Sequence, residues 1–271
     1  MRIFLLALFF GLFITSCRNS DQEQVDDVFM RNEKYDFQGL QIIAHRGVWN
    51  YFGGVGNSMG AFTRFMNSDV HGMEMDIRMS KDSVLYVYHD AEINKHSIEN
   101  TPSEILSQQN ISSSEKLPKL EEMLSSFGDI KTKTLFFDVK ESMNPKYNKA
   151  VIIKLLQLLD QYQLSSSNKI MASERTMQKT LKDYNHKYSS VLLTSSPNFT
   201  VESLLADNFR EVAVSIALYD SQPELMQQLK NNNIKIHIWT VNDLNRIKTM
   251  PGQNIASVIT DYPLEIMEHY K

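Results

Sequence analysis

The chain has 271 residues, 42% of them hydrophobic and 22% charged, which is an ordinary globular composition with enough apolar material for one large core. The net charge of −4, without a basic stripe or basic tail, argues against nucleic acid as a partner. With a single cysteine the chain has no disulfide framework.

The N-terminus has the pattern of an export signal. Arg2 precedes an unbroken apolar run from Ile3 to Ile14, and Thr15-Ser16-Cys17 follows. A positive start, a short apolar core and small residues are typical of a secretory signal, and the run is short for a membrane span. Ile14-Thr15-Ser16-Cys17 resembles a bacterial lipobox, in which the cysteine is lipidated and becomes the new N-terminus. We therefore expect an exported lipoprotein, anchored to the membrane through Cys17 on the periplasmic or cell-surface face. A plain signal peptide with an incidental cysteine is the alternative.

The sequence divides into three predicted segments. Residues 1–17 form the signal peptide with Cys17, residues 18–38 a tether, and residues 39–271 the folded domain. The tether is polar and acidic, with little apolar content, which is typical of a flexible linker.

Short β-rich runs alternate with helical stretches through the folded domain. The strand candidates are Leu40–Ala44, Met73–Ile77, Val84–Tyr88, Thr134–Val139, Lys169–Ala172, Ser190–Thr194, Glu211–Ile216, Lys235–Thr240 and Ala256–Thr260. The helical stretches include Ser58–Asn67, Leu120–Phe127, Tyr147–Tyr162, Glu174–Tyr184, Pro223–Asn231 and Asp243–Met250. This alternation predicts βαβ units and a parallel sheet.

The predicted fold class is α/β, a TIM-type (β/α)8 barrel, because about 250 residues is the usual size of that fold. The nine strand candidates exceed its eight places by one. Val84–Tyr88 follows Met73–Ile77 too closely for a helical crossover, so it is the candidate for a hairpin arm. The segment Ile93–Lys116 shows no clear periodicity and is expected to form a small insertion over the active rim.

Two carboxylates lie on one predicted strand. Glu74 and Asp76 are two residues apart and point to the same face, while Met73, Met75 and Ile77 occupy the other. Burying two carboxylates inside a barrel is costly without a cation, so we expect a metal site. An ordinary amphipathic strand with a solvated face is the alternative. Oxygen ligands favour Mg²⁺ or Ca²⁺ over zinc.

A further carboxylate and a cation follow another apolar run. Asp138 comes after Leu135-Phe136-Phe137, and Lys140 lies two residues further on, so both share a face. Asp138 would complete an open metal site with Glu74 and Asp76, and Lys140 would then point at a phosphate oxygen. A surface ion pair at a strand end is the alternative.

Two histidines and an arginine also follow apolar runs. His45 and Arg46 come after the first strand candidate, and His89 comes after Val84–Tyr88. Either histidine alone would more often be structural. Together with Arg46 and the carboxylates they suggest phosphodiester cleavage, with one imidazole as base, the other as acid, and the guanidinium gripping a phosphate oxygen.

The remaining candidates are weaker. Trp239, at the end of another strand, either packs against the alcohol portion of the substrate or belongs to the core. Five other histidines lack comparable surroundings in the sequence, and we expect them to be structural or exposed: His71, His96, His186, His237 and His269.

These motifs together resemble the glycerophosphodiester phosphodiesterase family. The resemblance covers roughly residues 40 to 265 and rests on eight motifs in order. They are Ala44-His45-Arg46-Gly47, Asn57-Ser58 with Ala61-Phe62, Glu74-Met75-Asp76, Val87-Tyr88-His89-Asp90, Leu117-Pro118-Lys119-Leu120-Glu121, Phe137-Asp138-Val139-Lys140, Ile238-Trp239-Thr240-Val241-Asn242 and Ile259-Thr260-Asp261-Tyr262-Pro263.

The resemblance implies a TIM-type barrel with a small insertion, one divalent metal, and hydrolysis of a glycerophosphodiester to an alcohol and sn-glycerol 3-phosphate. By position, His45 and His89 match the acid/base pair, and Arg46 and Lys140 match the phosphate contacts. Glu74, Asp76 and Asp138 match the metal ligands.

The chain departs from the family pattern in two places. Val55-Gly56 precedes Asn57 where the family usually has Pro-Glu, and Asp138 stands where it usually has glutamate. Two alternatives therefore remain. One is a phospholipase D-like activity on lysophospholipids or sphingolipids, with an apolar groove near Trp49, Tyr51 and Phe52. The other is a surface lipoprotein that binds phosphodiesters without turning them over.

Overall fold

The computed structural model describes residues 34–51, 53–184 and 186–270. The predicted signal peptide, Cys17 and most of the predicted tether therefore lie outside the described residues, as does Phe52 of the expected apolar groove. Within the described part, no helix combines the length and the apolar character that a membrane span needs.

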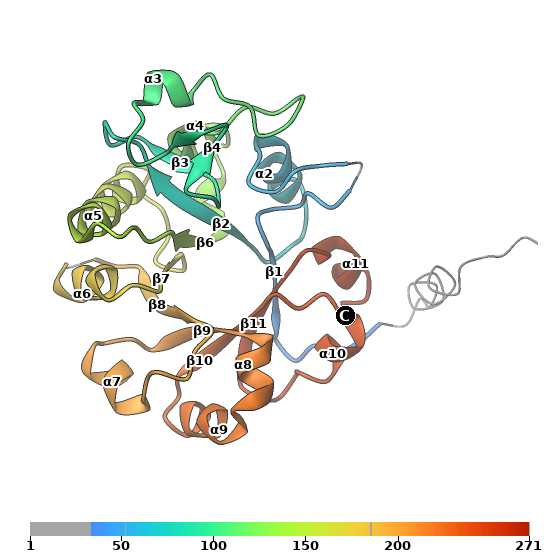
Figure 1. Cartoon of the computed structure of the whole chain (residues 1–271). Coiled ribbons are helices and arrows are strands. Elements are labelled where there is room, and N and C mark those ends of the chain that lie inside the picture. Colours follow the sequence, from blue (N-terminus) through green and yellow to red (C-terminus); the bar gives the residue numbers. More distant parts are fainter. Residues whose placement is uncertain (1–33, 52, 185, 271) are drawn as a thin grey trace, which may run out of the picture. The chain divides into compact units, whose positions relative to one another are not determined.

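Eight parallel strands close into a barrel (Figure 1). They are β1 (Gln41–Ala44), β2 (Gly72–Met79), β6 (Thr134–Val139), β7 (Lys169–Ala172), β8 (Ser189–Thr194), β9 (Glu211–Ser215), β10 (Lys235–Trp239) and β11 (Ile255–Thr260). The hydrogen-bonded order runs β1-β11-β10-β9-β8-β7-β6-β2, and β2 also pairs with β1, which closes the ring. The predicted (β/α)8 barrel is confirmed.

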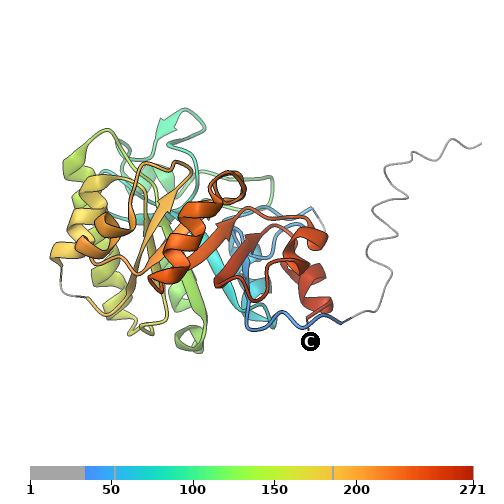
Figure 2. The same ribbon diagram turned by 90° about the horizontal axis from the view of Figure 1, so that it is seen from below.

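The predicted strand Val84–Tyr88, the candidate beyond the eight barrel strands, is a hairpin arm, as its short connection to β2 indicated. β3 (Leu85–Val87) runs antiparallel to β2 and takes no place in the ring. After it come the short hairpin of β4 (Glu92–Ile93) and β5 (His96–Ser97), and then α3 (Ser103–Leu106). This insertion has its own small core, formed by Tyr86, Ile93, Ile98, Leu106 and Leu117. Figure 2 shows the insertion projecting from one end of the barrel.

Helices surround the barrel on the outside (Figure 1). They are α2 (Met59–Met66), α4 (Leu120–Ser125), the 3₁₀ helix η1 (Ile130–Thr132), α5 (Pro145–Gln161), α6 (Arg175–Asp183), α7 (Val201–Ala206), α8 (Ile216–Ser221), α9 (Pro223–Asn231), α10 (Leu244–Lys248) and α11 (Pro263–Glu268). Several begin at a polar cap, as α2 does where Ser58 Oγ accepts a hydrogen bond from the Ala61 amide. The Ser215 hydroxyl caps α8 in the same way, so the predicted strand Glu211–Ile216 ends one residue early.

The folded domain begins earlier than predicted. Tyr35 forms a β-bridge with Tyr270, and its amide donates to the His269 carbonyl at 2.8 Å. Phe37 is 1% exposed and stacks on the Tyr270 ring. The compact unit therefore starts at Lys34 rather than at residue 39, because two aromatic residues within the acidic segment supply apolar area that a tether would leave in water.

A buried polar cluster occupies the barrel interior near the amino ends of the strands. Glu211 accepts from Lys169 Nζ at 2.8 Å, and its other oxygen lies 2.8 Å from His237 Nε2. His237 Nδ1 lies 2.7 Å from Ser257 Oγ. His237 is thus structural, as expected, but it does have an acidic partner, supplied by the neighbouring strand β9. Burial opposes ionisation of Glu211, yet His237 and Lys169 outweigh it and lower its pKa.

Replacing Glu211 by alanine should destabilise the fold by about 3–5 kcal/mol, because it leaves Lys169 and His237 buried without their acceptor. Urea denaturation measures this loss, and kcat of the folded variant should be unchanged. The exposed Glu224 of α9 provides a control, since Glu224→Ala should cost less than about 1 kcal/mol. Equal stability of the two variants would contradict this account of the cluster.

Candidate active site

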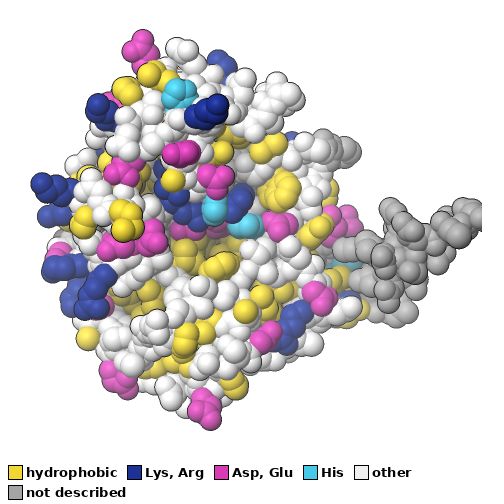
Figure 3. Space-filling model, in the orientation of Figure 1, with side chains coloured by type: hydrophobic (Ala, Val, Ile, Leu, Met, Phe, Trp, Pro, Cys, Tyr) yellow, Lys and Arg dark blue, Asp and Glu magenta, His cyan; other side chains and the backbone are white. Residues whose placement is uncertain are grey.

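The carboxyl ends of the barrel strands surround a pocket of about 230 Å³. In parallel barrels this end carries the chemistry, because every strand delivers its last side chains to the same rim. Figure 3 shows histidine, acidic and basic side chains gathered near the middle of this face, beside hydrophobic ones. The pocket is lined by His45, Arg46, Glu74, Asp76, His89, Asp138, Lys140, Met171, Leu193, Trp239, Thr240 and Ile259. Every pocket residue predicted from the sequence is among them.

Three buried carboxylates lie at the polar wall of the pocket. Glu74 and Asp76 come from β2, and Asp138 comes from β6, where it pairs in register with Asp76. Glu74 is 3%, Asp76 1% and Asp138 7% exposed, so the alternative of a solvated face is wrong. Met73, Met75 and Ile77 pack instead in the apolar layer between barrel and helices. One oxygen from each carboxylate lies within 4.8 Å of the others.

Two cations offset part of this buried negative charge. Lys140 Nζ contacts Asp76 Oδ1 at 2.7 Å and Asp138 Oδ2 at 2.5 Å, and Arg46 Nε lies 3.1 Å from Asp76 Oδ2. Burial opposes ionisation of Asp76, but these two cations hold its pKa below the usual range. Burial raises the pKa of Asp138, and burial together with the charges of the other two carboxylates raises that of Glu74 well above its ordinary value.

Asn57 also holds the central carboxylate, that of Asp76. Its Nδ2 donates to Asp76 Oδ2 at 2.6 Å, and its Oδ1 accepts from the Asp76 amide at 3.2 Å. Asn57 has φ 58°, a left-handed conformation that asparagine tolerates better than most residues. The sequence motif containing Asn57 was noted, but its contact with Asp76 was not predicted.

The donor set suits a divalent cation. Among the residues that the structure describes, Glu74, Asp76 and Asp138 are the group of three whose ligand atoms converge. Their oxygens suit a hard cation such as Mg²⁺ or Ca²⁺. Burial is the largest cause of the raised pKa values of Glu74 and Asp138, and a bound divalent ion would favour the charged forms of both carboxylates. The residues present therefore fit the metal that the sequence predicted.

His45 lies at the end of β1 and is held by the last strand. Its Nδ1 lies 2.7 Å from Asp261 Oδ1, and its Nε2 lies 4.0 Å from Glu74 Oε2. Burial opposes ionisation of Asp261, but hydrogen bonds from His45 and Asn242 lower its pKa. No role for Asp261 was predicted from the sequence. It could have been found by the pattern that identified His45, since Asp261 also follows an apolar strand run directly.

His89 is held more loosely. Its Nδ1 lies 2.7 Å from Asp90 Oδ1, but the two side chains are 45% and 67% exposed. Its carbonyl accepts from Arg78 Nε at 2.9 Å. Arg78 lies two residues beyond Asp76 on β2, and burial lowers its pKa. Backbone anchoring by Arg78 is a further contact that the sequence analysis did not anticipate.

The opposite wall of the pocket is apolar. Trp239 packs against the inner cluster of the barrel, which includes Phe136, Met171 and Ile259, and it also lines the pocket. The core packing of Trp239 is therefore confirmed, and its contact with the substrate stays a prediction. Two residues of the expected apolar groove form hydrogen bonds to the backbone. Trp49 Nε1 donates to the His45 carbonyl at 3.0 Å, and the Tyr51 hydroxyl accepts from the Glu265 amide at 3.3 Å.

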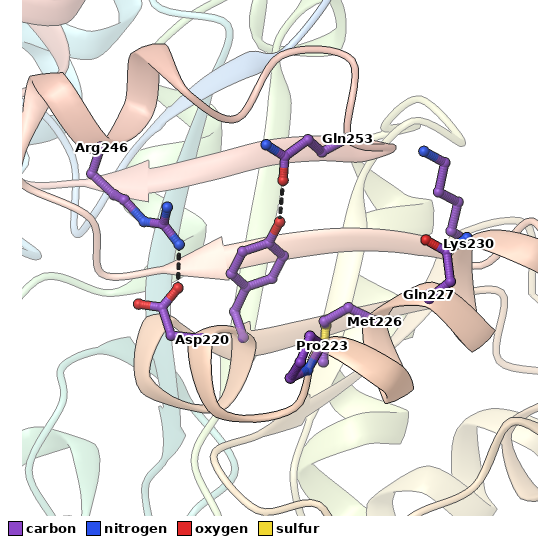
Figure 4. A pocket seen from close by; sticks show the side chains of 8 residues that line it. Asp220, Pro223, Met226, Gln227, Lys230, Arg246 and Gln253 are labelled. Atoms are coloured by element: carbon purple, nitrogen blue, oxygen red, sulfur yellow. Dashed lines mark hydrogen bonds and ion pairs between the residues drawn. The ribbon is translucent and has the colours of Figure 1, made fainter.

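A larger cavity on the outside of the barrel carries no comparable chemistry. It has a volume of about 350 Å³ and lies among α8, α9, α10 and the loop before β11. Figure 4 shows Arg246 turned toward Asp220, with which it forms an ion pair. The Tyr219 hydroxyl donates to Gln253 Oε1 at 2.7 Å. The barrel mouth, with its convergent titratable groups, is the candidate active site.

Barrel fold and site together define an enzyme of the phosphoric diester hydrolase class. The model of the glycerophosphoryl diester phosphodiesterase family matches residues 45–265, and the chain belongs to that family.

Similar proteins agree with this assignment. A glycerophosphodiester phosphodiesterase from Caldanaerobacter subterraneus subsp. tengcongensis is 22% identical over 244 residues, which cover 82% of this chain and 94% of the relative. The crystal structure of a glycerophosphodiester phosphodiesterase from Parabacteroides distasonis matches with TM-score 0.79 and 24% identity, over 85% of this chain and 96% of the other. A phosphodiesterase from Oleispira antarctica, in complex with the product sn-glycerol-3-phosphate, matches with TM-score 0.74 and 19% identity, over 84% and 96%.

Gly47 sets the backbone that follows His45 and Arg46. It has φ 86°, and an added Cβ would lie 3.0 Å from Ala61 Cβ and 3.1 Å from the Ala61 carbonyl carbon. Gly47→Ala should cost about 2–3 kcal/mol and lower activity, because α2 must move away from the loop. Gly39→Ala is a matched control with φ 81° and nothing within 4 Å, and should cost only about 1 kcal/mol. Thermal denaturation compares them, and equal losses would contradict the packing argument.

Proposed function

We propose that the chain hydrolyses glycerophosphodiesters to an alcohol and sn-glycerol 3-phosphate, with a divalent metal and two histidines. The single observation that carries the proposal is the convergence of His45, His89 and three buried carboxylates on one pocket. The product named for the Oleispira antarctica relative has the same chemistry and supports the proposed substrate class.

The polar wall would bind the phosphodiester. Arg46 and Lys140 are the cations beside the carboxylates, and a substrate phosphate would take hydrogen bonds from both. One imidazole would accept a proton from the attacking water as its oxygen bonds to phosphorus, and the other would donate a proton to the departing alcohol oxygen as the P–O bond breaks. After this step the first histidine is protonated and the second is not. Transfer of one proton from the first to the second through solvent restores the starting protonation of both.

The metal would be held by Glu74, Asp76 and Asp138. When bound, it would polarise a phosphoryl oxygen and offset the charge that develops on phosphorus. The apolar wall formed by Met171, Leu193, Trp239 and Ile259 favours a second candidate, a phospholipase D-like activity on lysophospholipids or sphingolipids, whose apolar portion that wall could contact. A non-catalytic binding role has less support, because His45, His89 and the three carboxylates all line one pocket.

Localisation is a separate proposal that rests on the sequence pattern alone. The run from Ile3 to Ile14 followed by Cys17 supports export and membrane anchoring through a lipid on Cys17.

One experiment tests substrate and metal together. Turnover of glycerophosphocholine and of lysophosphatidylcholine is measured in excess EDTA and after addition of Mg²⁺ or Ca²⁺. We expect glycerophosphocholine to be hydrolysed only with metal. Calorimetry should show weaker metal binding for Asp138→Asn, by about 10-fold or more, because one ligand charge is lost. Faster turnover of lysophosphatidylcholine than of glycerophosphocholine would favour the second candidate. Full activity in excess EDTA would refute the proposed metal dependence.

We expect that loss of either histidine lowers kcat strongly. His45→Ala and His89→Ala should each lower kcat by about 10²–10⁴-fold, because each loses a proton transfer. Melting temperatures should stay near that of the wild type, and the two losses should not add, since the residues act as a unit. His96→Ala, in β5 of the insertion, is the control and should cost little. Near-wild-type turnover by either site variant would overturn the mechanism.

A further inference from the structure

The two histidines of the site are supported in different ways, although each has an aspartate 2.7 Å from its Nδ1. Asp90 is the chain neighbour of His89 and is 67% exposed, so water competes for this contact. Asp261 directly follows β11, 216 residues further along the chain. It is only 20% exposed and holds a ring that is itself 21% exposed. A partly buried, charge-assisted hydrogen bond fixes geometry better than an exposed one.

Asp261 is in turn held from two directions. Asn242 Nδ2 donates to Asp261 Oδ2 at 2.8 Å, and Asn242 Oδ1 accepts from the Asp261 amide at 2.9 Å. The Thr260 hydroxyl also donates to Asn242 Oδ1, at 3.2 Å. Asn242 therefore grips both the side chain and the backbone of Asp261, and it leaves one carboxylate oxygen, Oδ1, aimed at His45.

The backbone connections make this arrangement rigid. The His45 amide donates to the Thr260 carbonyl at 2.8 Å, and the Val241 amide donates to the Ile259 carbonyl at 3.0 Å. Three neighbouring strand ends, those of β1, β10 and β11, are thus tied together at the points where His45, Asn242 and Asp261 emerge. The Trp49 indole holds the His45 carbonyl from the other side.

We propose, on the basis of the function proposed above, that Asp261 and Asn242 are positioning residues that hold His45 in one ring orientation and one tautomer. With Nδ1–H donated to Asp261, the neutral imidazole carries its free lone pair on Nε2, the atom that faces Glu74 and the pocket. Neither Asp261 nor Asn242 lines the pocket, so both act through His45.

The kinetic test uses substitutions that keep side-chain size. Asp261→Asn should lower kcat for glycerophosphocholine by about 10²-fold and leave KM nearly unchanged, because an amide removes the charge that selects the tautomer. Asn242→Ala should give a smaller loss of kcat, since Asp261 keeps its charge. Asp243→Asn is the matched control: Asp243 is the next residue along the rim and caps α10, a role that asparagine also fills.

A double-mutant cycle separates positioning from general damage to the fold. In the His45→Ala background, adding Asp261→Asn should lower the residual kcat by less than about 3-fold, because the residue through which Asp261 acts is already gone. An unchanged kcat in the single variant would overturn the proposal. So would an equal loss from Asp261→Asn in the presence and absence of His45.

A spectroscopic readout tests the contact independently of activity. Proton NMR of the wild-type chain should show a strongly downfield Nδ1–H resonance that disappears in both His45→Ala and Asp261→Ala. A wild-type spectrum without this resonance would overturn the proposal even if the enzyme is active. A wild-type chain that shows the resonance but hydrolyses neither substrate would refute the proposed function and leave the assigned hydrogen bond standing.

Discussion

Three carboxylates are buried at one point of the barrel wall, and the positions of the neighbouring side chains depend on this burial. Unpaired charges out of water are too costly to persist, so each carboxylate needs partners. Lys140 bridges two of them, Arg46 contacts the central one, and the Arg46 amide donates to Glu74 Oε2 at 2.9 Å. In the proposed function, Lys140 and Arg46 are also the groups that a phosphodiester would contact. The same two cations would therefore offset the buried negative charge and bind the substrate.

The barrel interior is layered along its axis. A paired polar cluster of Lys169, Glu211 and His237 lies near the amino ends of the strands. An apolar layer that includes Ile43, Phe136 and Val191 separates it from the mouth. The two polar regions therefore have separate tasks. The lower one is satisfied internally and contributes to the fold, whereas the upper one keeps donors and acceptors available to ligands.

The histidines differ in a way that their similar sequence settings do not suggest. His45 is fixed through its ring by Asp261, while His89 is anchored mainly through its carbonyl by Arg78. A ring with fixed tautomer suits a task in which one nitrogen must always face the reacting atoms. The His89 ring is more exposed and lies on the connection from β3 to the insertion, which has its own small core.

The sequence by itself determined the barrel strands, six of the helices and the set of polar residues that gather at the pocket. Apolar runs ending in polar residues identified all eight barrel strands, the extra hairpin arm and the residues from His45 to Lys140 that line the pocket. This succeeded because barrel strands, which are buried on both faces, are mostly apolar before they reach the rim. The tertiary structure alone decided which strand ends are neighbours. Asp261 lies beside His45 because β11 closes the barrel against β1, with Ala44 opposite Thr260. Glu211 reaches His237 through the register of β9 and β10. Such partners depend on closure and register between distant segments, which the local order of residues does not encode.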